Sequence, residues 1–297
     1  MKNLWSDREA AATMKRYAKM GVNRDVALRV YTTRLLGGDP RLVIHGGGNT
    51  SVKTRMRDLT GRELDVLCVK GSGWDMGDIE PPGLPAVRLE PLRELAALES
   101  LSDEDMVNAQ RGNLLDSTSP NPSVETLLHA FLPHKFIDHT HSNAVLALTD
   151  QPNGEEICRE LYGDRAALVP YIMPGFALAK KAMEVQAANP ECQGLILLKH
   201  GVFSFGESAE EAYGGMVRLV TMAERRISKA KRKQLAQVRL PKKLMKPAEV
   251  APILRGLCAL PDGDEAKRFV LTFRSNSSIR KYVSARELER FSQDGNV

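Results

Sequence analysis

The chain has 297 residues, of which 42% are hydrophobic and 27% charged, as is typical of a globular protein with one large domain or one domain and an appendage. Its four cysteines are scattered without paired spacing, which argues against both a disulfide framework and a zinc ribbon. The charged N-terminus lacks the apolar run of a secretory signal, and no segment has the length and apolarity needed to span a bilayer. We therefore expect a cytoplasmic protein with no membrane partner.

The net charge of +5 comes from one segment. Ten basic residues and no acidic residue lie between Arg225 and Lys246, and the rest of the chain has 32 basic against 37 acidic residues. Such a run can bind RNA or an anionic surface, but this one has no interleaved aromatic side chains for base stacking. We interpret it as a solvated helix end and linker, and we expect no nucleic-acid partner.

The first half of the chain alternates helices with short β segments. The pattern predicts two helices within residues 1–37, then a short apolar strand at 41–44 and a glycine-rich turn. Alternating strands are expected to follow as far as Asp75. Residues 84–98 have a helical pattern, and residues 100–120 have the pattern of a helix followed by a loop.

The second half is predicted to begin with a helix near Ser123 and a strand that ends at His141. A β-hairpin is expected over 194–206, with its turn at His200 and Gly201. Ser208 and Glu211 then have the spacing of a capping box, which predicts the start of a long helix. The other expected elements are a helix at 142–151, a strand at 166–169, a helix at 176–189 and, in the appendage, a helix at 248–257, a strand at 267–275 and an amphipathic helix at 284–292.

This mixture of hairpins and helices is not a regular βαβ alternation. It predicts an α/β fold in which helices cover a mostly antiparallel sheet, and it argues against a doubly wound parallel sheet. We divide the chain into a main domain at residues 1–235 and a small C-terminal appendage, with its basic linker, at residues 236–297.

Two histidines define a candidate metal site. His139 and His141 lie two residues apart on a predicted strand, so their side chains point to the same face. His200 lies at a predicted hairpin turn, and Glu125 lies near the start of the central helix. Three neutral imidazoles and a carboxylate form a site for a first-row divalent metal, most often zinc. A histidine by itself is more often a satisfied polar residue, so the prediction depends on the in-register pair.

Three segments are rich in backbone donors and hydroxyl groups. They are the loop from His45 to Ser51, the sequence Lys70-Gly71-Ser72-Gly73, and the helix start at Asn121-Pro122-Ser123. Glycines permit close approach of a ligand, and concave N–H groups and helix N-termini bind anions. Each loop alone is more often a tight turn, but together, beside a metal site, they predict a phosphorylated substrate.

Two other enzyme classes can be tested against the sequence. The HGGG motif occurs in the oxyanion hole of α/β-hydrolases, but that fold also needs a G-x-S-x-G nucleophile elbow, which the sequence lacks. The Rossmann fingerprint G-x-G-x-x-G is absent as well. The sequence therefore argues against a serine hydrolase and against a dinucleotide site within this chain.

The GGGNTS and KGSG loops, the Ser-x-Glu sequence, the HTH pair and the KHG tripeptide together resemble the class II aldolase/adducin superfamily over roughly residues 25–235. The LPHKFIDHTHS stretch and the region after the basic linker are most similar to the aldolase half of bifunctional rhamnulose-1-phosphate aldolase/short-chain dehydrogenase proteins. The resemblance implies a three-layer α/β/α fold and a homotetramer with active sites at subunit interfaces. It also implies a dehydrogenase domain in longer relatives, so the chain can be a separate aldolase or part of a longer protein.

The resemblance assigns a role to individual residues. It implies that His139, His141 and His200 bind Zn²⁺ or another divalent metal, and that Glu125 is the catalytic acid/base. The residues that match the phosphate-binding loops are Gly48, Asn49, Ser72, Gly73 and Ser123. Related fuculose aldolases also use a tyrosine from a neighbouring subunit, for which the candidates here are Tyr162 and Tyr171. We expect His45 and His134 to be structural, and His129 to be the first replacement candidate among the ligands.

The implied activity is the cleavage of a ketose 1-phosphate, such as rhamnulose 1-phosphate, into dihydroxyacetone phosphate and an aldehyde. Two alternatives on the same metal site are a pentulose-phosphate 4-epimerase and a sugar-acid phosphate decarboxylase. A third is a non-catalytic adducin-like scaffold, but that alternative predicts loss of the histidines, and all three are present.

Overall fold

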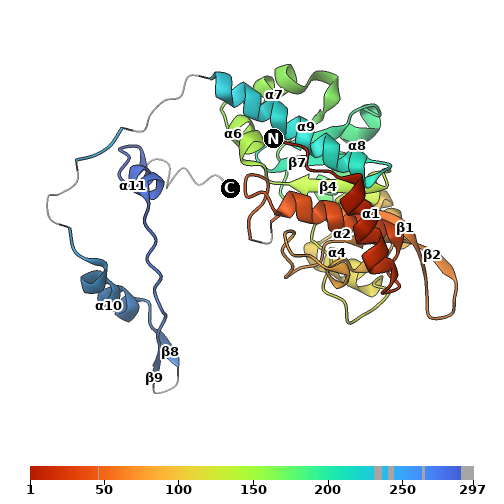
Figure 1. The fold of residues 1–297 in the computed structure, drawn as a ribbon, viewed down its shortest axis with the longest axis horizontal. Coiled ribbons are helices and arrows are strands. Elements are labelled where there is room, and N and C mark those ends of the chain that lie inside the picture. Colours follow the sequence, from red (N-terminus) through yellow and green to blue (C-terminus); the bar gives the residue numbers. More distant parts are fainter. Residues whose placement is uncertain (46, 231–235, 240–243, 263–264, 289–297) are drawn as a thin grey trace. The chain divides into compact units, whose positions relative to one another are not determined.

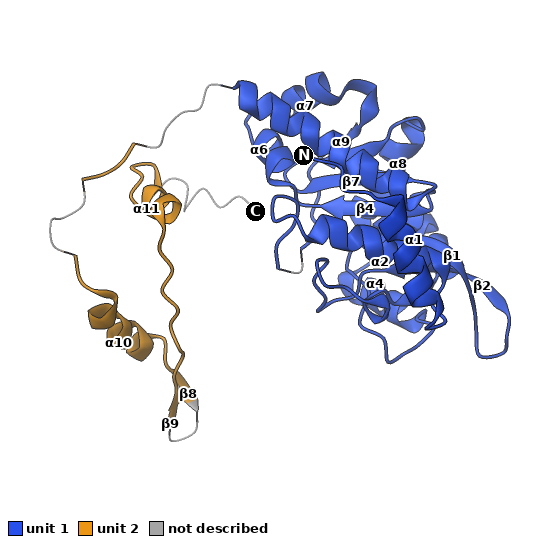
Figure 2. Ribbon diagram, in the orientation of Figure 1, with its two compact units in different colours: residues 1–230 blue, residues 231–297 orange. Residues whose placement is uncertain are grey.

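The structure is a computed structural model that describes residues 1–45, 47–230, 236–239, 244–262 and 265–288. The chain consists of two compact units, Met1–Ala230 and Lys231–Val297, which are blue and orange in Figure 2. The division lies in the same basic segment in which we expected the domain boundary. None of the described helices is long and apolar enough to cross a membrane.

A seven-stranded sheet with the order β3-β2-β1-β4-β7-β6-β5 forms the middle of unit 1 (Figure 1). All neighbouring strands are antiparallel except β5 and β6, which are parallel. The strands are Asn49–Arg57 (β1), Glu63–Val69 (β2), Ala86–Arg88 (β3), Phe136–Thr140 (β4), Ala167–Val169 (β5), Gly194–Leu197 (β6) and Gly201–Gly206 (β7). The predicted mostly antiparallel α/β fold is confirmed.

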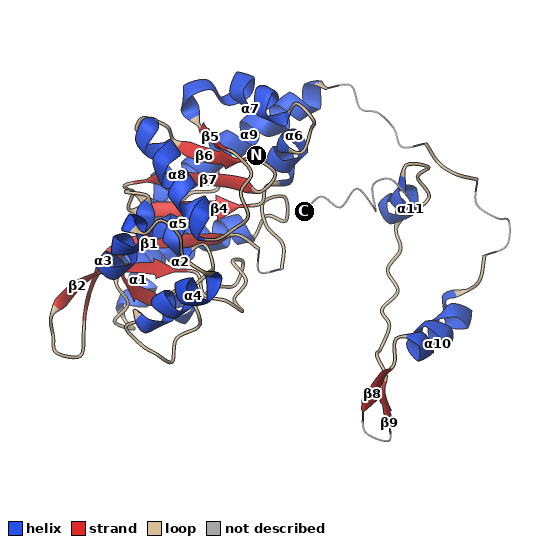
Figure 3. Cartoon of the chain, turned by 180° about the vertical axis from the view of Figure 1, so that it is seen from behind, coloured by secondary structure: helices blue, strands red, loops and turns tan. Residues whose placement is uncertain are grey.

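Helices cover both faces of the sheet, which gives three layers (Figure 3). One face carries Leu89–Glu94 (α3), Asp103–Gly112 (α4), Thr126–Phe131 (α5) and Phe176–Ala188 (α8). The other face carries Asp7–Ala18 (α1), Arg24–Gly37 (α2), Asn143–Thr149 (α6), Gly154–Tyr162 (α7) and Ala209–Lys229 (α9). Short 3₁₀ segments occur at Pro81–Gly83, Leu95–Ala97 and Gly163–Arg165.

Strand alternation builds a core on each side of the sheet. Along β2, Leu67 and Val69 pack into the cluster beneath α5 and α8, whereas Val66 and Cys68 pack into a cluster on the opposite face. Helix starts follow the sequence signals as well. The Ser208 hydroxyl accepts a hydrogen bond from the Glu211 N–H at 3.1 Å and so caps α9 as predicted. The other half of the predicted capping box differs, because the Glu211 carboxylate accepts from the Glu207 N–H at 2.9 Å and not from Ser208.

The described residues of unit 2 include the helices Pro247–Leu257 (α10) and Ser277–Val283 (α11) and the antiparallel strands Leu260–Asp262 (β8) and Glu265–Lys267 (β9). The predicted strand at 267–275 is wrong, because β9 ends at Lys267 and the following residues lie in no strand. Helix α11 was not predicted, and it begins where the Asn276 side chain caps it by accepting from the Ile279 N–H at 2.8 Å. The predicted helix at 284–292 is wrong over 284–287, which form turns and a bridge, and residues 289–292 lie outside the described residues.

Two predictions for unit 1 also need correction. Residues 41–44 form turns and not a strand, because Asp39 accepts hydrogen bonds from the Arg41 and Leu42 N–H groups and so bends the backbone locally. The segment at 84–98 begins as strand β3 before it becomes helix α3, because its first residues pair with β2. The glycine-rich turn that follows residue 44 is present, although Gly46 lies outside the described residues.

Candidate metal centre and anion cavity

Four side chains from three parts of the fold converge at one end of the sheet. His139 lies on β4, His141 directly follows that strand, His200 occupies the turn between β6 and β7, and Glu125 caps α5. Their ligand atoms all lie within 4.8 Å of one another, and this is the group that could hold a metal ion among the described residues. The three predicted histidines and the predicted carboxylate are thus brought together.

The side chains of this cluster approach one another within hydrogen-bonding or ion-pair distance. The two Nε2 atoms of His139 and His141 are 2.9 Å apart. Glu125 reaches two histidines, with Oε2 3.3 Å from His139 Nε2 and Oε1 3.3 Å from His200 Nε2. The sequence predicts Glu125 in the first turn of a helix, whereas it is the N-cap residue and α5 begins at Thr126.

Local backbone features make this convergence possible. His139 lies opposite Phe203 in the pairing of β4 with β7, so the His200 turn is carried next to the end of β4. Gly201 follows that turn, and a Cβ atom there would lie 2.5 Å from the Thr140 carbonyl oxygen and 3.0 Å from the His139 ring. Only glycine fits at this close approach.

The histidines are neutral and offer lone pairs. Burial lowers the pKa of His139, His141 and His200, so the contacts with Glu125 are not ion pairs of a protonated imidazole. His139 Nδ1 lies 3.2 Å from the Val202 carbonyl oxygen, to which it can only donate. Its Nε2 therefore faces the cluster as an acceptor, in the tautomer that a metal ligand requires.

The cost of burying the Glu125 carboxylate is only partly offset by hydrogen bonds from the described residues. Burial raises its pKa, while His200 and the hydrogen bond from Asn49 act in the opposite direction. Its Oε1 atom is buried and accepts no hydrogen bond from the described residues. A buried acceptor beside three imidazole lone pairs is costly without a cation, so the donor set fits a divalent metal.

A cavity of 330 Å³ opens beside the cluster. Its lining includes every residue that we predicted for phosphate binding, namely Gly48, Asn49, Ser72, Gly73 and Ser123. Glu125 and His141 also line it, so the cavity and the histidine cluster share two residues. An anion bound in the cavity would therefore lie next to the candidate metal ligands.

Two of the predicted loops form the cavity wall as one hydrogen-bonded unit. The Ser72 N–H donates to the Asn121 carbonyl oxygen at 2.8 Å, and the Ser123 N–H donates to the Lys70 carbonyl oxygen at 3.1 Å. The third loop contacts them through Asn49, whose amide donates to Ser123 Oγ at 3.1 Å. The preceding Gly48 has φ 66°, and a Cβ atom there would lie 2.6 Å from Val43.

Lys70 also lines this cavity, although no binding role was predicted for it from the sequence. A sequence signal for such a role exists, because Lys70 follows strand β2 and directly precedes the glycines of the loop. Burial lowers the pKa of Lys70, and Asp75 opposes that effect.

The remaining predicted residues lie elsewhere. Tyr162 is buried in the core next to α9, with its hydroxyl 3.4 Å from the Leu219 carbonyl oxygen, and Tyr171 is exposed with its hydroxyl near the Met173 sulfur. His134 stacks on Phe205 at 4.0 Å. The structure therefore brings neither tyrosine to the cluster within one copy of the chain.

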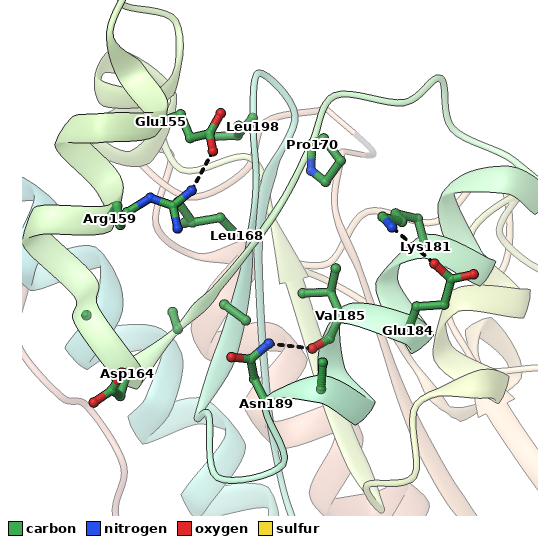
Figure 4. Close-up of a pocket in the computed structure, with 14 residues that line it drawn as sticks. Glu155, Arg159, Asp164, Leu168, Pro170, Lys181, Glu184, Val185, Asn189 and Leu198 are labelled. Atoms are coloured by element: carbon green, nitrogen blue, oxygen red, sulfur yellow. Dashed lines mark hydrogen bonds and ion pairs between the residues drawn. The ribbon is translucent and has the colours of Figure 1, made fainter.

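A larger hollow of 570 Å³ lies between α7 and α8, along the edge strand β5 (Figure 4). Four of the five charged side chains that line it are already paired, Glu155 with Arg159 at 2.6 Å and Glu184 with Lys181 at 3.1 Å. Its chemistry is that of solvated helix surfaces, so we assign the candidate site to the smaller cavity.

Comparisons with known proteins agree with this geometry. The family described as "Class II Aldolase and Adducin N-terminal domain" matches residues 28–227. The structure of the N-terminal class II aldolase domain of a conserved protein from Thermoplasma acidophilum has 37% sequence identity and a TM-score of 0.68, and the match covers 76% of this chain and 99% of that one.

Two curated relatives are similar in sequence. An uncharacterized oxidoreductase, YuxG of Bacillus subtilis, is 33% identical over 99% of this chain, which spans only 42% of that protein. A methylthioribulose-1-phosphate dehydratase from Yersinia enterocolitica is 30% identical over 38% of this chain and 63% of its own length. With the family match covering most of unit 1, this chain belongs to the class II aldolase and adducin family.

Proposed function

We propose that the chain is a metal-dependent aldolase that cleaves a ketose 1-phosphate between C3 and C4, releasing dihydroxyacetone phosphate and an aldehyde. The observation that carries this proposal is the position of Glu125, which lies both in the histidine cluster and in the wall of the donor-lined cavity. Rhamnulose 1-phosphate or a similar deoxyketose phosphate is the substrate that we infer.

Each group of residues has a distinct task. The Ser72 and Ser123 hydroxyls and the glycine-rich backbone would hold the phosphate, so that binding energy from a group that does not react orients the carbon chain. His139, His141 and His200 would hold the metal, for which we infer Zn²⁺. A divalent ion there supplies Lewis acidity toward substrate oxygens.

Glu125 would move the proton. Breaking the C3–C4 bond leaves negative charge on the carbon next to the carbonyl, and that carbon must gain a proton before dihydroxyacetone phosphate leaves. The C4 hydroxyl loses a proton as the aldehyde forms, and the desolvated Glu125 carboxylate would take up that proton and return it to C3. In the reverse direction the carboxylate would remove the proton from C3. The buried position of Glu125 keeps bulk water from competing for that transfer.

A second candidate has a specific observation in its favour. The Yersinia enterocolitica relative is named for the dehydration of a ketose 1-phosphate, and water elimination also begins with proton removal beside a carbonyl. The two activities differ in products and not in the anion that the cavity must hold.

We also propose a cytoplasmic homotetramer, in line with the family resemblance. The oxidoreductase name of YuxG and the 42% of its length that this chain spans support a dehydrogenase function in the rest of that relative.

The test is an assay of the purified, zinc-loaded chain against a panel of ketose 1-phosphates, with dihydroxyacetone phosphate measured by a coupled glycerol-phosphate dehydrogenase. We expect its release from a deoxyketose 1-phosphate together with an equimolar aldehyde. Consumption of substrate without either product would overturn the aldolase proposal in favour of the dehydratase or an epimerase.

A further inference from the structure

Helix α5 is attached to strand β1 through one buried histidine. Asn49, Ser51 and Lys53 alternate along β1, so all three point to the same face, and each makes a contact with His129. Ser51 Oγ lies 2.8 Å from His129 Nδ1, Asn49 Oδ1 lies 2.5 Å from His129 Nε2, and Lys53 Nζ donates to the His129 carbonyl oxygen at 2.8 Å. His129 itself is fully buried.

The contacts of Asn49 with Glu125 and Ser123 determine which atom donates in each hydrogen bond of His129. Asn49 Nδ2 donates to Glu125 Oε2 at 2.6 Å and to Ser123 Oγ at 3.1 Å. The Asn49 amide nitrogen faces Glu125 and Ser123, so the amide oxygen faces His129, and an amide oxygen can only accept. His129 Nε2 therefore carries the ring proton, and Nδ1 accepts the proton of the Ser51 hydroxyl. Burial lowers the pKa of His129, which keeps the ring neutral with one proton.

We propose that His129 is a positioning residue whose Nε2–H group fixes the amide of Asn49, so that this amide bridges Ser123 in the anion cavity and Glu125 in the histidine cluster. The inference rests on the proposed function for its catalytic consequence. With Oε2 held by Asn49, Oε1 of Glu125 remains free of hydrogen bonds from the described residues, on the side of His200. An Asn49 amide turned by half a rotation would instead place its oxygen against the carboxylate.

The sharpest test uses two amide replacements of different length. In His129→Gln the side-chain nitrogen can occupy the position of Nε2 and donate to Asn49, whereas the shorter amide of His129→Asn reaches only the position of Nδ1. We expect kcat of the Gln variant within about threefold of wild type, and a loss of about 10- to 100-fold for the Asn variant, the usual worth of a residue that orients a ligand. KM should change little in either variant.

The matched control is the same pair of substitutions at His134. That residue follows α5 and its ring stacks on Phe205, while its backbone carbonyl oxygen, which both substitutions keep, accepts from Lys53. His134→Gln and His134→Asn should have equal kcat values. Equal losses for the Gln and Asn variants at position 129 would overturn the proposal, because they would show that His129 only fills space.

A second measurement is independent of activity. Nitrogen NMR of ¹⁵N-histidine-labelled wild-type protein, with His129→Gln used for assignment, should show His129 as the neutral Nε2–H tautomer with a slowly exchanging proton. A proton on Nδ1 would overturn the proposal. If the wild-type chain cleaves no ketose phosphate, the proposed function fails, while the tautomer measurement still decides the position of His129.

Discussion

Two adjacent residues of β4 place polar groups on opposite faces of the sheet, and their surroundings differ in one respect. Asp138 points to the face of α2, where the buried guanidinium of Arg29 pairs with it and also donates to the Ser51 and Ile137 carbonyl oxygens. His139 points to the face of α5, where Glu125 and two further histidines converge.

The two sites differ in where a positive charge can come from. Burial raises the pKa of Asp138, and the chain's own arginine opposes that effect, so the charge of this carboxylate is paired within the fold. On the other face, three neutral imidazoles and a carboxylate converge without a positively charged side chain among their described contacts. A buried acceptor cluster that the fold does not itself neutralise indicates a place for a ligand cation.

The largest effect is expected where the cation is part of the chain. Arg29→Met keeps the side-chain volume but leaves Asp138 buried and unpaired, and we expect the free energy of unfolding to fall by about 3–5 kcal/mol in urea denaturation. The double variant with Asp138→Leu should recover much of that loss, because it removes the orphaned charge. A loss below about 1 kcal/mol in the single variant would show that the pair does not stabilise the fold.

On the other face of the sheet, we expect a substitution at Glu125 to lower the catalytic rate and not the stability of the fold. Glu125→Gln keeps the size of the side chain but cannot accept a proton, so we expect kcat to fall by about a hundredfold or more, with metal retained and little change in phosphate affinity. Glu207→Gln, at an exposed carboxylate, is the control and should keep wild-type turnover. A wild-type kcat in the Glu125 variant would show that this residue only starts the helix, and the proton carrier would then be sought among the tyrosines.

The cavity should respond to charge. Ser72→Asp places a carboxylate where a phosphate is expected, and we expect KM to rise by about tenfold or more through like-charge repulsion. Inorganic phosphate should compete with substrate for the wild-type enzyme. Ser72→Asn is the neutral control of similar size, and an unchanged KM in the Asp variant would remove Ser72 from the site.

Lys53 is an intermediate case, since it is a buried cation that is held by two backbone carbonyl oxygens, those of His129 and His134. Burial lowers its pKa to about 7, with Arg93 acting in the same direction and Glu207 against it. Between pH 7 and its unfolded pKa of about 10.4, the unfolded chain binds more protons, so stability should rise with pH by at most about 1.4 kcal/mol per unit. Lys53→Met should flatten that rise, and an identical pH profile would contradict the assignment.

The sequence was sufficient for features that depend on local spacing. The histidine pair at the end of β4, the turn at His200 and the helix start capped by Ser208 all occur where the pattern predicted them. The pairing of loops from distant segments was also foreseen, because glycine and hydroxyl groups were concentrated in the segments that now line one cavity.

Contacts between distant residues could not be foreseen in the same way. The bond of His129 to Asn49 joins residues 80 positions apart, and it arises only when α5 packs across β1. Residues 41–44 have an apolar strand pattern, but hydrogen bonds to Asp39 bend the backbone, so no strand forms there. The role of Lys70 in the cavity wall likewise depends on which strand end lies next to the Ser123 segment.

The most direct test of the central claim is the metal content of the purified protein. One divalent ion, Zn²⁺ when zinc is supplied, should be found per wild-type chain, and the His139→Ala/His141→Ala variant should retain little of it although it remains folded. The same pair of changes at His45 and His134, neither of which belongs to the cluster, should leave the stoichiometry unchanged. Full stoichiometric metal in the His139/His141 variant would contradict the account and would place the metal elsewhere in the chain.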